Sequence, residues 1–319
     1  MRFLIIDSNA LLHRAFHALP PLQDKEGRQT GAVYGFLLTL FRAIKDISPD
    51  YIAAAFDTPS PTFRHKKFKE YKAKREKAPD EFYQQIPITK EILGALNIPI
   101  FEKPGFEADD IIATIAKKIQ KEQIYPEIET YIVTGDQDTL QLVNKNTKVY
   151  TLGRGIKETV ILDKEKVVEK YGILPEQMID FKALAGDPSD NIPGATGIGK
   201  KTASEILKKF GSLDNLYKKI EDKNFKDINP RIKKILLEQK EQILFSQILA
   251  KARDDAPIDF KITNCSFGSF DIKKVEEIFE KYSFYSLKKR LKEIIKNSDN
   301  KNEEKSNDFS KAFKDGKLF

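Results

Sequence analysis

The sequence of 319 residues contains one cysteine, three histidines and no tryptophan. The single cysteine, Cys265, excludes an internal disulfide, and the scattered histidines (His13, His17 and His65) have no zinc-binding spacing. No apolar run approaches the roughly 20 residues that a membrane-spanning helix requires. The apolar N-terminus is interrupted at Asp7, too early for a signal peptide. We therefore expect a cytoplasmic protein with no membrane association, and any bound metal to be a hard ion held by oxygen.

The charge and hydrophobic content are those of a globular protein. There are 55 Lys and Arg residues against 48 Asp and Glu, a net charge of +7, and 40% of the residues are hydrophobic. This length suffices for one large domain or two ordinary ones. The basic excess is compatible with an anionic partner but does not establish one, because many solvated surfaces carry a similar excess.

Alternating strand and helix signals fill the first half of the chain. Short apolar runs at 2–6, 51–56, 98–101 and 131–133 predict buried strands. Apolar residues at helical spacing in 31–47 and 108–119 predict helices between them. This alternation predicts an α/β fold with a mostly parallel central sheet flanked by helices.

The second half has a different character. The strand signals fade after about residue 165, and helical windows follow at 202–210, 230–252 and 270–295. We expect an α/β domain over 1–175, a helical region over 176–296, and a polar, disordered tail or linker over 297–319.

Acidic residues follow the predicted strands. Asp7 and Asp57 end the first two, Glu107, Asp109 and Asp110 follow the third, and the fourth is followed by Asp136 and Asp138. A last pair, Asp187 and Asp190, begins the helical region. Because ligands bind at the carboxyl ends of parallel strands, we expect these acids to converge there.

Each acid alone is compatible with an ordinary turn or helix cap. Several carboxylates gathered at one sheet edge would repel strongly unless cations neutralise them. With no Cys or His among them, Mg²⁺ or Mn²⁺ is the natural ion, and the number of acids favours a two-metal site for phosphodiester hydrolysis.

A glycine-rich segment begins at Gly194. It almost matches a P-loop, but Lys201 stands where that motif requires Ser or Thr, and no buried strand precedes it. We interpret residues 190–210 as a helix–hairpin–helix, in which Gly197 and Gly199 form a tight turn and the following helix offers backbone N–H groups to a phosphate. Such a module grips the backbone without reading bases. A plain glycine-rich connector is the alternative.

A basic segment follows the second strand. Residues 64–77 contain eight Lys and Arg residues against two acidic ones. A solvated surface is one interpretation; the other is a segment that draws in a single strand by phosphate neutralisation and by stacking on Phe68 and Tyr71. Lys72 and Arg75 are three residues apart, so on a helix both could point at the scissile phosphate.

The motifs, taken in order, resemble those of the flap endonuclease family, including the 5′-nuclease domain at the N-terminus of bacterial DNA polymerase I. The resemblance covers about residues 2–290. Its motifs are Asp7-Ser-Asn, Phe56-Asp57, Tyr71-Lys72 with Arg75, Gly105-Phe-Glu-Ala-Asp-Asp110, Thr134-Gly-Asp-Gln-Asp138, Gly186-Asp-Pro-Ser-Asp-Asn-Ile-Pro-Gly194 and Gly197-Ile-Gly-Lys-Lys-Thr-Ala203.

The resemblance implies roles for particular residues. All nine acids would form the site for two Mg²⁺ or Mn²⁺ ions, some binding directly and some through water. Because every one of these positions is acidic, the resemblance implies an active enzyme. Residues 62–85 would form an arch over the single-stranded 5′ end, and the hairpin would hold duplex DNA, often with a K⁺ ion. The implied catalytic residues are Lys72, Arg75 and Tyr71, and the implied DNA-binding residues are Arg64, Lys67, Gly197, Gly199, Lys200, Lys201 and Thr202.

The implied function is a structure-selective 5′→3′ exonuclease and 5′-flap endonuclease of replication and repair, acting as a monomer near the nucleoid on DNA flaps, nicks and RNA–DNA primer junctions. The chain stops at Phe319, so we expect either a stand-alone nuclease or the terminal piece of a longer protein that includes a polymerase domain. The final Leu318-Phe319 resembles the ending of sliding-clamp peptides.

Two other functions stay open. Asp136-Gln-Asp138 resembles the Asp-x-Asp of haloacid-dehalogenase-type phosphatases, which would make the protein a Mg²⁺-dependent small-molecule phosphohydrolase. The other alternative is a catalytically silent DNA-binding paralogue.

Overall fold

One mostly parallel sheet organises the protein. The computed structural model describes residues 1–121, 128–153, 159–222 and 225–295. Within them the strand order is β3-β2-β1-β4-β5-β6, and only β6 is antiparallel to its neighbour. The strands are β1 (Arg2–Asp7), β2 (Tyr51–Ala55), β3 (Ile100–Phe101), β4 (Glu129–Val133), β5 (Thr147–Leu152) and β6 (Thr159–Leu162). The predicted α/β class with a mostly parallel sheet is confirmed.

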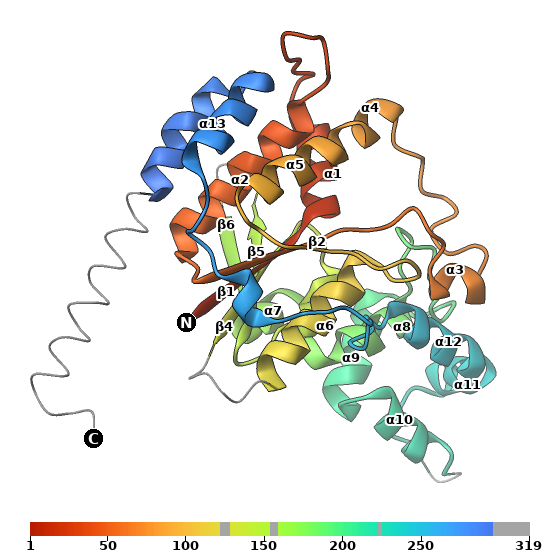
Figure 1. Cartoon of the computed structure of the whole chain (residues 1–319). Coiled ribbons are helices and arrows are strands. Elements are labelled where there is room, and N and C mark those ends of the chain that lie inside the picture. The colour runs from red at the N-terminus through yellow and green to blue at the C-terminus, as the bar shows by residue number, and fades with distance from the viewer. Residues whose placement is uncertain (122–127, 154–158, 223–224, 296–319) are drawn as a thin grey trace, which may run out of the picture.

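Helices cover both faces of this sheet (Figure 1). On one face, the side chains of Leu4 and Ile6 pack with α1 (Ser8–Ala18), α2 (Gly31–Ile47), α5 (Gln85–Ala95) and α13 (Ile272–Lys281). On the other, Phe3 and Ile5 pack with α6 (Ala108–Lys121) and α7 (Lys164–Tyr171). Successive side chains of β1 therefore pack into the hydrophobic clusters on opposite faces of the sheet, and this explains why the strand is a continuous apolar run.

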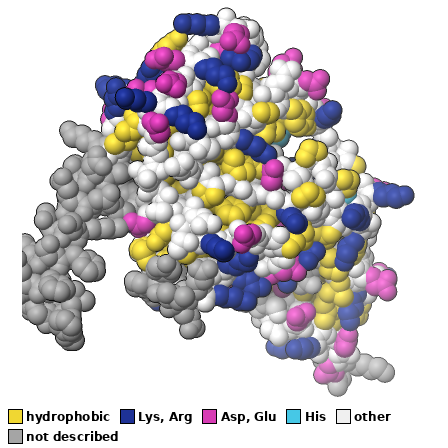
Figure 2. Space-filling view, in the orientation of Figure 1, with side chains coloured by type: hydrophobic (Ala, Val, Ile, Leu, Met, Phe, Trp, Pro, Cys, Tyr) yellow, Lys and Arg dark blue, Asp and Glu magenta, His cyan; other side chains and the backbone are white. Residues whose placement is uncertain are grey.

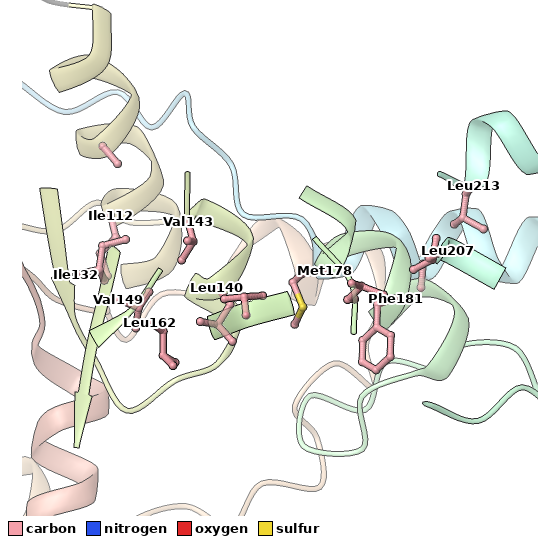
Figure 3. Packing of buried hydrophobic residues seen from close by; sticks show 14 of the residues in the cluster. Ile112, Ile132, Leu140, Val143, Val149, Leu162, Met178, Phe181, Leu207 and Leu213 are labelled. Carbon is pink, nitrogen blue, oxygen red and sulfur yellow. The ribbon is translucent and has the colours of Figure 1, made fainter. Parts of the chain in front are cut away.

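The helices of the second half join the core on the α6 face. Figure 3 shows buried side chains running from Ile112 and Ile132 beside the sheet, through Leu140 and Met178, to Leu207. The remaining elements are α3 (Phe63–Lys67), α4 (Asp80–Tyr83), η1 (Asp138–Leu142), η2 (Pro175–Gln177), α8 (Met178–Ala185), α9 (Lys200–Phe210), α10 (Leu213–Ile220), α11 (Pro230–Glu238), α12 (Lys240–Ala250) and η3 (Ile262–Cys265). This shared core fixes α8 and the loop after it against the carboxyl ends of the strands.

The end of the described chain returns to the α/β part. Val275 and Phe279 of α13, and Leu287 and Leu291 of a further helix at 285–295, lie in the core with α2 and α5. The described helices of the predicted region 176–296 therefore pack on both faces of the sheet, the earlier ones on the α6 face and the last ones on the α2 face. Residues 297–319 lie outside the described residues, and so does the expectation about their C-terminal Leu-Phe.

Several sequence predictions were imprecise. β5 and β6 were missed, because polar residues interrupt the apolar run of β5 and β6 is a short antiparallel edge strand. The window 230–252 is two helices separated at Gln239, and the window 270–295 is interrupted at 282–284. No described helix is long and apolar enough to cross a membrane.

Candidate active site

A pocket of about 750 Å³ lies at the carboxyl ends of the parallel strands. The order of the strands reverses between β1 and β4, the position where such sheets bind ligands. Seven of the nine predicted acids line the pocket: Asp7, Asp57, Glu107, Asp109, Asp136, Asp138 and Asp187. The pocket is also lined by the cationic side chains of Arg14, Lys72, Arg75, Lys182 and Lys200.

The strand-end acids are held by neighbouring backbone and hydroxyl groups. Asp7 accepts hydrogen bonds from the Thr134 hydroxyl, at 2.6 Å, and from the Ala10 N–H at the start of α1. Asp57 accepts from the Ala108 N–H, at 2.7 Å, and its own N–H donates to Asn9. These bonds join β1, β2, β4 and the start of α6, and so fix the pocket's acidic wall.

Burial and mutual repulsion raise the pKa of four of these acids, among them Asp57. Burial, opposed by the Thr134 hydrogen bond and aided by repulsion from Asp136 and Asp57, raises the pKa of Asp7 to about 7. Burial also raises the pKa of Asp138 to about 7, although attraction to Lys182 opposes it. The pKa of Asp109 lies well above its ordinary value because of burial and repulsion by Asp136, Asp7 and Asp138. Such a pocket favours either bound protons or a bound cation.

The donor set fits a hard divalent cation. All the candidate ligands are carboxylate oxygens, the ligands that Mg²⁺ and Mn²⁺ prefer, and several of them line one pocket. Among the described residues, however, no three Asp, Glu, His or Cys side chains enclose a single point. The acids instead line the wall of an open pocket.

We expect Mg²⁺ to stabilise the protein more at about pH 8 than at about pH 5.5. Folding raises the pKa of Asp7 and of Asp138 from 3.8 to about 7. The protonated acids therefore contribute to the stability of the folded protein in full below pH 3.8, and this stability is lost as the pH rises through about 7. Above that pH the buried charges need a cation, whereas at pH 5.5 protons compete with it. Melting temperatures with and without Mg²⁺ measure the difference, and Asp7→Asn should reduce it. Equal stabilisation at both pH values would contradict this expectation.

Asp110 and Arg64 do not face the pocket. The Arg64 guanidinium is 3% exposed and donates to both oxygens of Asp110, at 2.9 and 3.0 Å, and to Glu107 at 3.2 Å. It also donates to the carbonyls of Leu249 and Lys251 after α12. Arg64 was predicted to bind DNA and Asp110 to bind metal; in this structure the two instead form a buried ion pair that ties the base of the arch to the helical region.

The two aromatic residues of the basic segment are also turned inward. Tyr71 is 3% exposed, and the Phe68 ring packs edge-on against Phe245 at 5.6 Å. The Tyr71 hydroxyl lies 3.1 Å from oxygens of both Glu107 and Asp190. The Tyr71 ring is therefore not available for the predicted stacking of bases, whereas Phe68 is only partly buried.

Lys72 and Arg75 reach the pocket from a turn, not from a helix. Lys72 has a φ of 56° in the left-handed region, and its N–H donates to the Asp190 carbonyl. Its Nζ lies 3.0 Å from Glu107, and the Arg75 guanidinium pairs with Asp190. Asp190 therefore anchors the two cations at the pocket's rim and does not itself line the pocket.

The glycine hairpin has the expected turn. Gly197 has a φ of 96°, and α9 begins at Lys200 with Gly199 as its N-cap, which provides no side-chain oxygen. The side chains of Lys200 and Lys201 are exposed beside this helix end, as is Lys67 at the end of α3, while Thr202 is half-buried. Figure 2 shows basic and acidic side chains interspersed over the visible face. On this face, surface charge alone therefore does not mark a path for a polyanion.

Sequence reasoning missed Lys182, Thr134 and Asn191. Lys182 lies between Asp138 and Asp187, and the Asn191 amide donates to the Glu70 carbonyl at the base of the arch. Thr134 lies inside a motif that was recognised for its acids. A lysine inside a helical window gives no such signal, because its partners are far apart in the chain.

The solved structures that match have the same fold. A flap endonuclease of bacteriophage T5, D15, in a complex with DNA and metal ions has a TM-score of 0.64 at 20% identity and covers 94% of this chain and 100% of its own. The catalytic core of Rad2 bound to DNA has a TM-score of 0.57 at 19% identity and covers 93% of this chain and 92% of its own. At these identities the likeness shows the fold alone.

Sequence comparisons give the family. The model described as 5′-3′ exonuclease, N-terminal resolvase-like domain matches residues 2–172, and the 5′-3′ exonuclease, C-terminal SAM fold model matches 173–273. The 5′-3′ exonuclease of Aquifex aeolicus is 38% identical over 292 residues, which are 92% of this chain and 96% of that protein. DNA polymerase I of Bacillus subtilis is 40% identical over 92% of this chain but only 32% of its own length. The chain belongs to the 5′-3′ exonuclease family and spans about a third of its polymerase I relatives.

Proposed function

We propose that the protein is a structure-selective 5′→3′ exonuclease and 5′-flap endonuclease that uses two divalent cations, Mg²⁺ or Mn²⁺. The observation that carries this proposal is the pocket itself, in which an acidic wall from four strand ends faces the cationic side chains of Lys72 and Arg75. An acidic wall suits cations, and the facing Lys and Arg suit a phosphate. Membership of the exonuclease family supports the same chemistry.

Within the pocket, Asp7, Asp109, Asp136, Asp138 and Asp187 would hold the cations, while Glu107 would connect them to the arch. When bound, the cations supply an activated water and stabilise the leaving 3′ oxygen. Lys72 and Arg75 would exchange their contacts with Glu107 and Asp190 for the scissile phosphate and stabilise its developing charge. The Tyr71 hydroxyl would keep Glu107 and Asp190 in place as a neutral hydrogen-bond donor. It stays neutral because burial and repulsion by these two acids raise its pKa.

The hairpin would grip duplex DNA by its backbone, with the exposed N-terminus of α9, Lys200 and Lys201 at the phosphates and a K⁺ ion at the turn. Specificity would then come from duplex shape and a free 5′ end. The substrates would be 5′ flaps, nicks and RNA–DNA primer junctions, with a polymerase domain or a sliding clamp as the protein partner, near the nucleoid.

A paired substrate assay tests this function. The protein with Mg²⁺ should cut a 5′-flap duplex and leave p-nitrophenyl phosphate intact, and EDTA should abolish cutting. Hydrolysis of only p-nitrophenyl phosphate would favour a small-molecule phosphohydrolase. Flap binding without any divalent-dependent cutting would favour a silent DNA-binding module.

We expect Lys72→Met to lower the single-turnover rate of flap cleavage about 100-fold, the magnitude typical of a group that stabilises transition-state charge. Affinity for the flap, measured in Ca²⁺, should change only a few-fold, because many other contacts hold the duplex. Lys66→Met is a matched control on the exposed side of α3 and should leave the rate near wild type. An unchanged rate for Lys72→Met would place this lysine outside the chemistry.

A further inference from the structure

Lys182 joins two acids of the pocket that come from different parts of the chain. Its Nζ lies 2.7 Å from Asp187, in the loop after α8, and forms a second ion pair with Asp138 at the start of η1. The lysine side chain is 12% exposed. One ammonium group therefore occupies the space between two predicted metal ligands.

Three other acids of the pocket have no direct ion-pair partner of this kind. Asp7 is held by a hydroxyl and a backbone N–H, both neutral donors. Within the described residues, Asp7, Asp109 and Asp136 form no ion pair with Lys or Arg. Lys182 thus pairs directly with Asp138 and Asp187, whereas Asp7, Asp109 and Asp136 have no Lys or Arg at ion-pair distance within the described residues.

We propose that Lys182 is a built-in cation that occupies the Asp138–Asp187 end of the pocket and makes the two divalent cations bind in order. The first would bind at the Asp7–Asp109–Asp136 end. The second would compete with the Lys182 ammonium for the oxygens of Asp138 and Asp187, and so would bind more weakly than the acids alone would allow. This inference rests on the proposed two-cation function.

The physical basis is competition for the same lone pairs. A lysine ammonium is a compact charge on a flexible four-carbon stem, so it can leave two carboxylates without moving α8. Removing a charge at hydrogen-bond distance from the site changes the attraction for a second cation by a factor of about ten or more, even at the high effective dielectric of a partly exposed pocket. Lys182 is thus a positioning residue that tunes metal affinity, and it need not touch the substrate.

Counting bound Mn²⁺ tests this directly. Titration of the full chain without DNA, followed by the electron paramagnetic resonance of free Mn²⁺, should give one tight and one weaker site. Lys182→Met should tighten the weaker site about tenfold or more and leave the tight site unchanged, while Lys182→Arg should behave as wild type. Lys200→Met is the matched control, because Lys200 lines the same pocket but forms no ion pair with an acid of the described chain.

Two outcomes would overturn the inference. In the first, Lys182→Met does not increase the Mn²⁺ affinity of the weaker site. In the second, Lys200→Met increases that affinity as much as Lys182→Met does. If Lys182→Met does not fold, ¹³C-dimethylated lysines of the wild type provide a second measurement. The Lys182 signal, assigned with Lys182→Arg, should shift only with the second equivalent of Mg²⁺; a shift with the first, or no shift, would contradict the proposal. These readouts count metal and do not depend on flap cleavage, so a failure of the nuclease function would be seen separately.

Discussion

Replacing Arg64 by methionine is expected to lower the free energy of unfolding by about 3–5 kcal/mol, the usual cost of removing one partner of a buried ion pair. The guanidinium donates to Asp110, Glu107 and two carbonyls, and the Asp110 side chain is fully buried. Methionine fills much of the volume but removes the only ion-pair partner of Asp110 among the described residues, whose carboxylate would keep only the N–H groups of Glu107 and Arg253, and it removes the Arg64 donor from two carbonyls. Denaturant unfolding followed by circular dichroism measures the loss.

Lys67→Met is the control, because it removes a positive charge from the exposed end of the same helix, α3. It should change the stability by no more than about 0.5 kcal/mol. In the double variant Arg64→Met with Asp110→Asn the losses should not add, because the two residues share one network. If both lysine and arginine variants unfold at the same denaturant concentration, Arg64 is not the structural anchor that its contacts indicate.

Arg64 also shows where prediction from the sequence stops. The basic segment was interpreted from its charge, and its residues Lys72 and Arg75 do line the pocket. Charge cannot tell that one arginine in the same run is buried, because its partners are Asp110, 46 residues away, and carbonyls more than 180 residues away. The same limit applies to Asp110, which belongs to the motif but lies on the side of α6 facing Arg64.

The strand-end acids were the predictable part of the site, for a topological reason. Parallel strands bring their carboxyl ends to one edge whatever the details of packing, so the positions of Asp7, Asp57 and Asp136 follow from recognising the strands. Lys182 belongs to a helix whose orientation depends on the core that Met178 and Phe181 share with Leu140. That packing depends on side chains from several elements, and no local pattern specifies it.

Gly194→Ala is expected to cost about 3 kcal/mol or more and to disorder the acid-bearing loop, because overlap with backbone cannot be relieved by a rotamer change. Gly194 has a φ of 61°, and an added Cβ would lie 2.2 Å from the Gly186 nitrogen and 2.6 Å from the Gly186 Cα. The close approach of these two glycines closes the loop that contains Asp187 and Asp190. Two backbone hydrogen bonds between Asp187 and Ile192 also hold this loop.

The variant should lose stability and pocket function together, because the same crossing sets the position of Asp187 beside Lys182 and of Asp190 beside Arg75. Thermal melting and Mn²⁺ binding at a temperature where the protein remains folded measure the two effects. Gly94→Ala, in α5 with open space around the added Cβ, should instead stabilise the helix by about 0.5–1 kcal/mol. The opposite result would be a Gly194→Ala protein that melts at the wild-type temperature and binds Mn²⁺ normally. This loop would then not depend on the close crossing, and the ion pairs of Lys182 and Arg75 alone would position its acids.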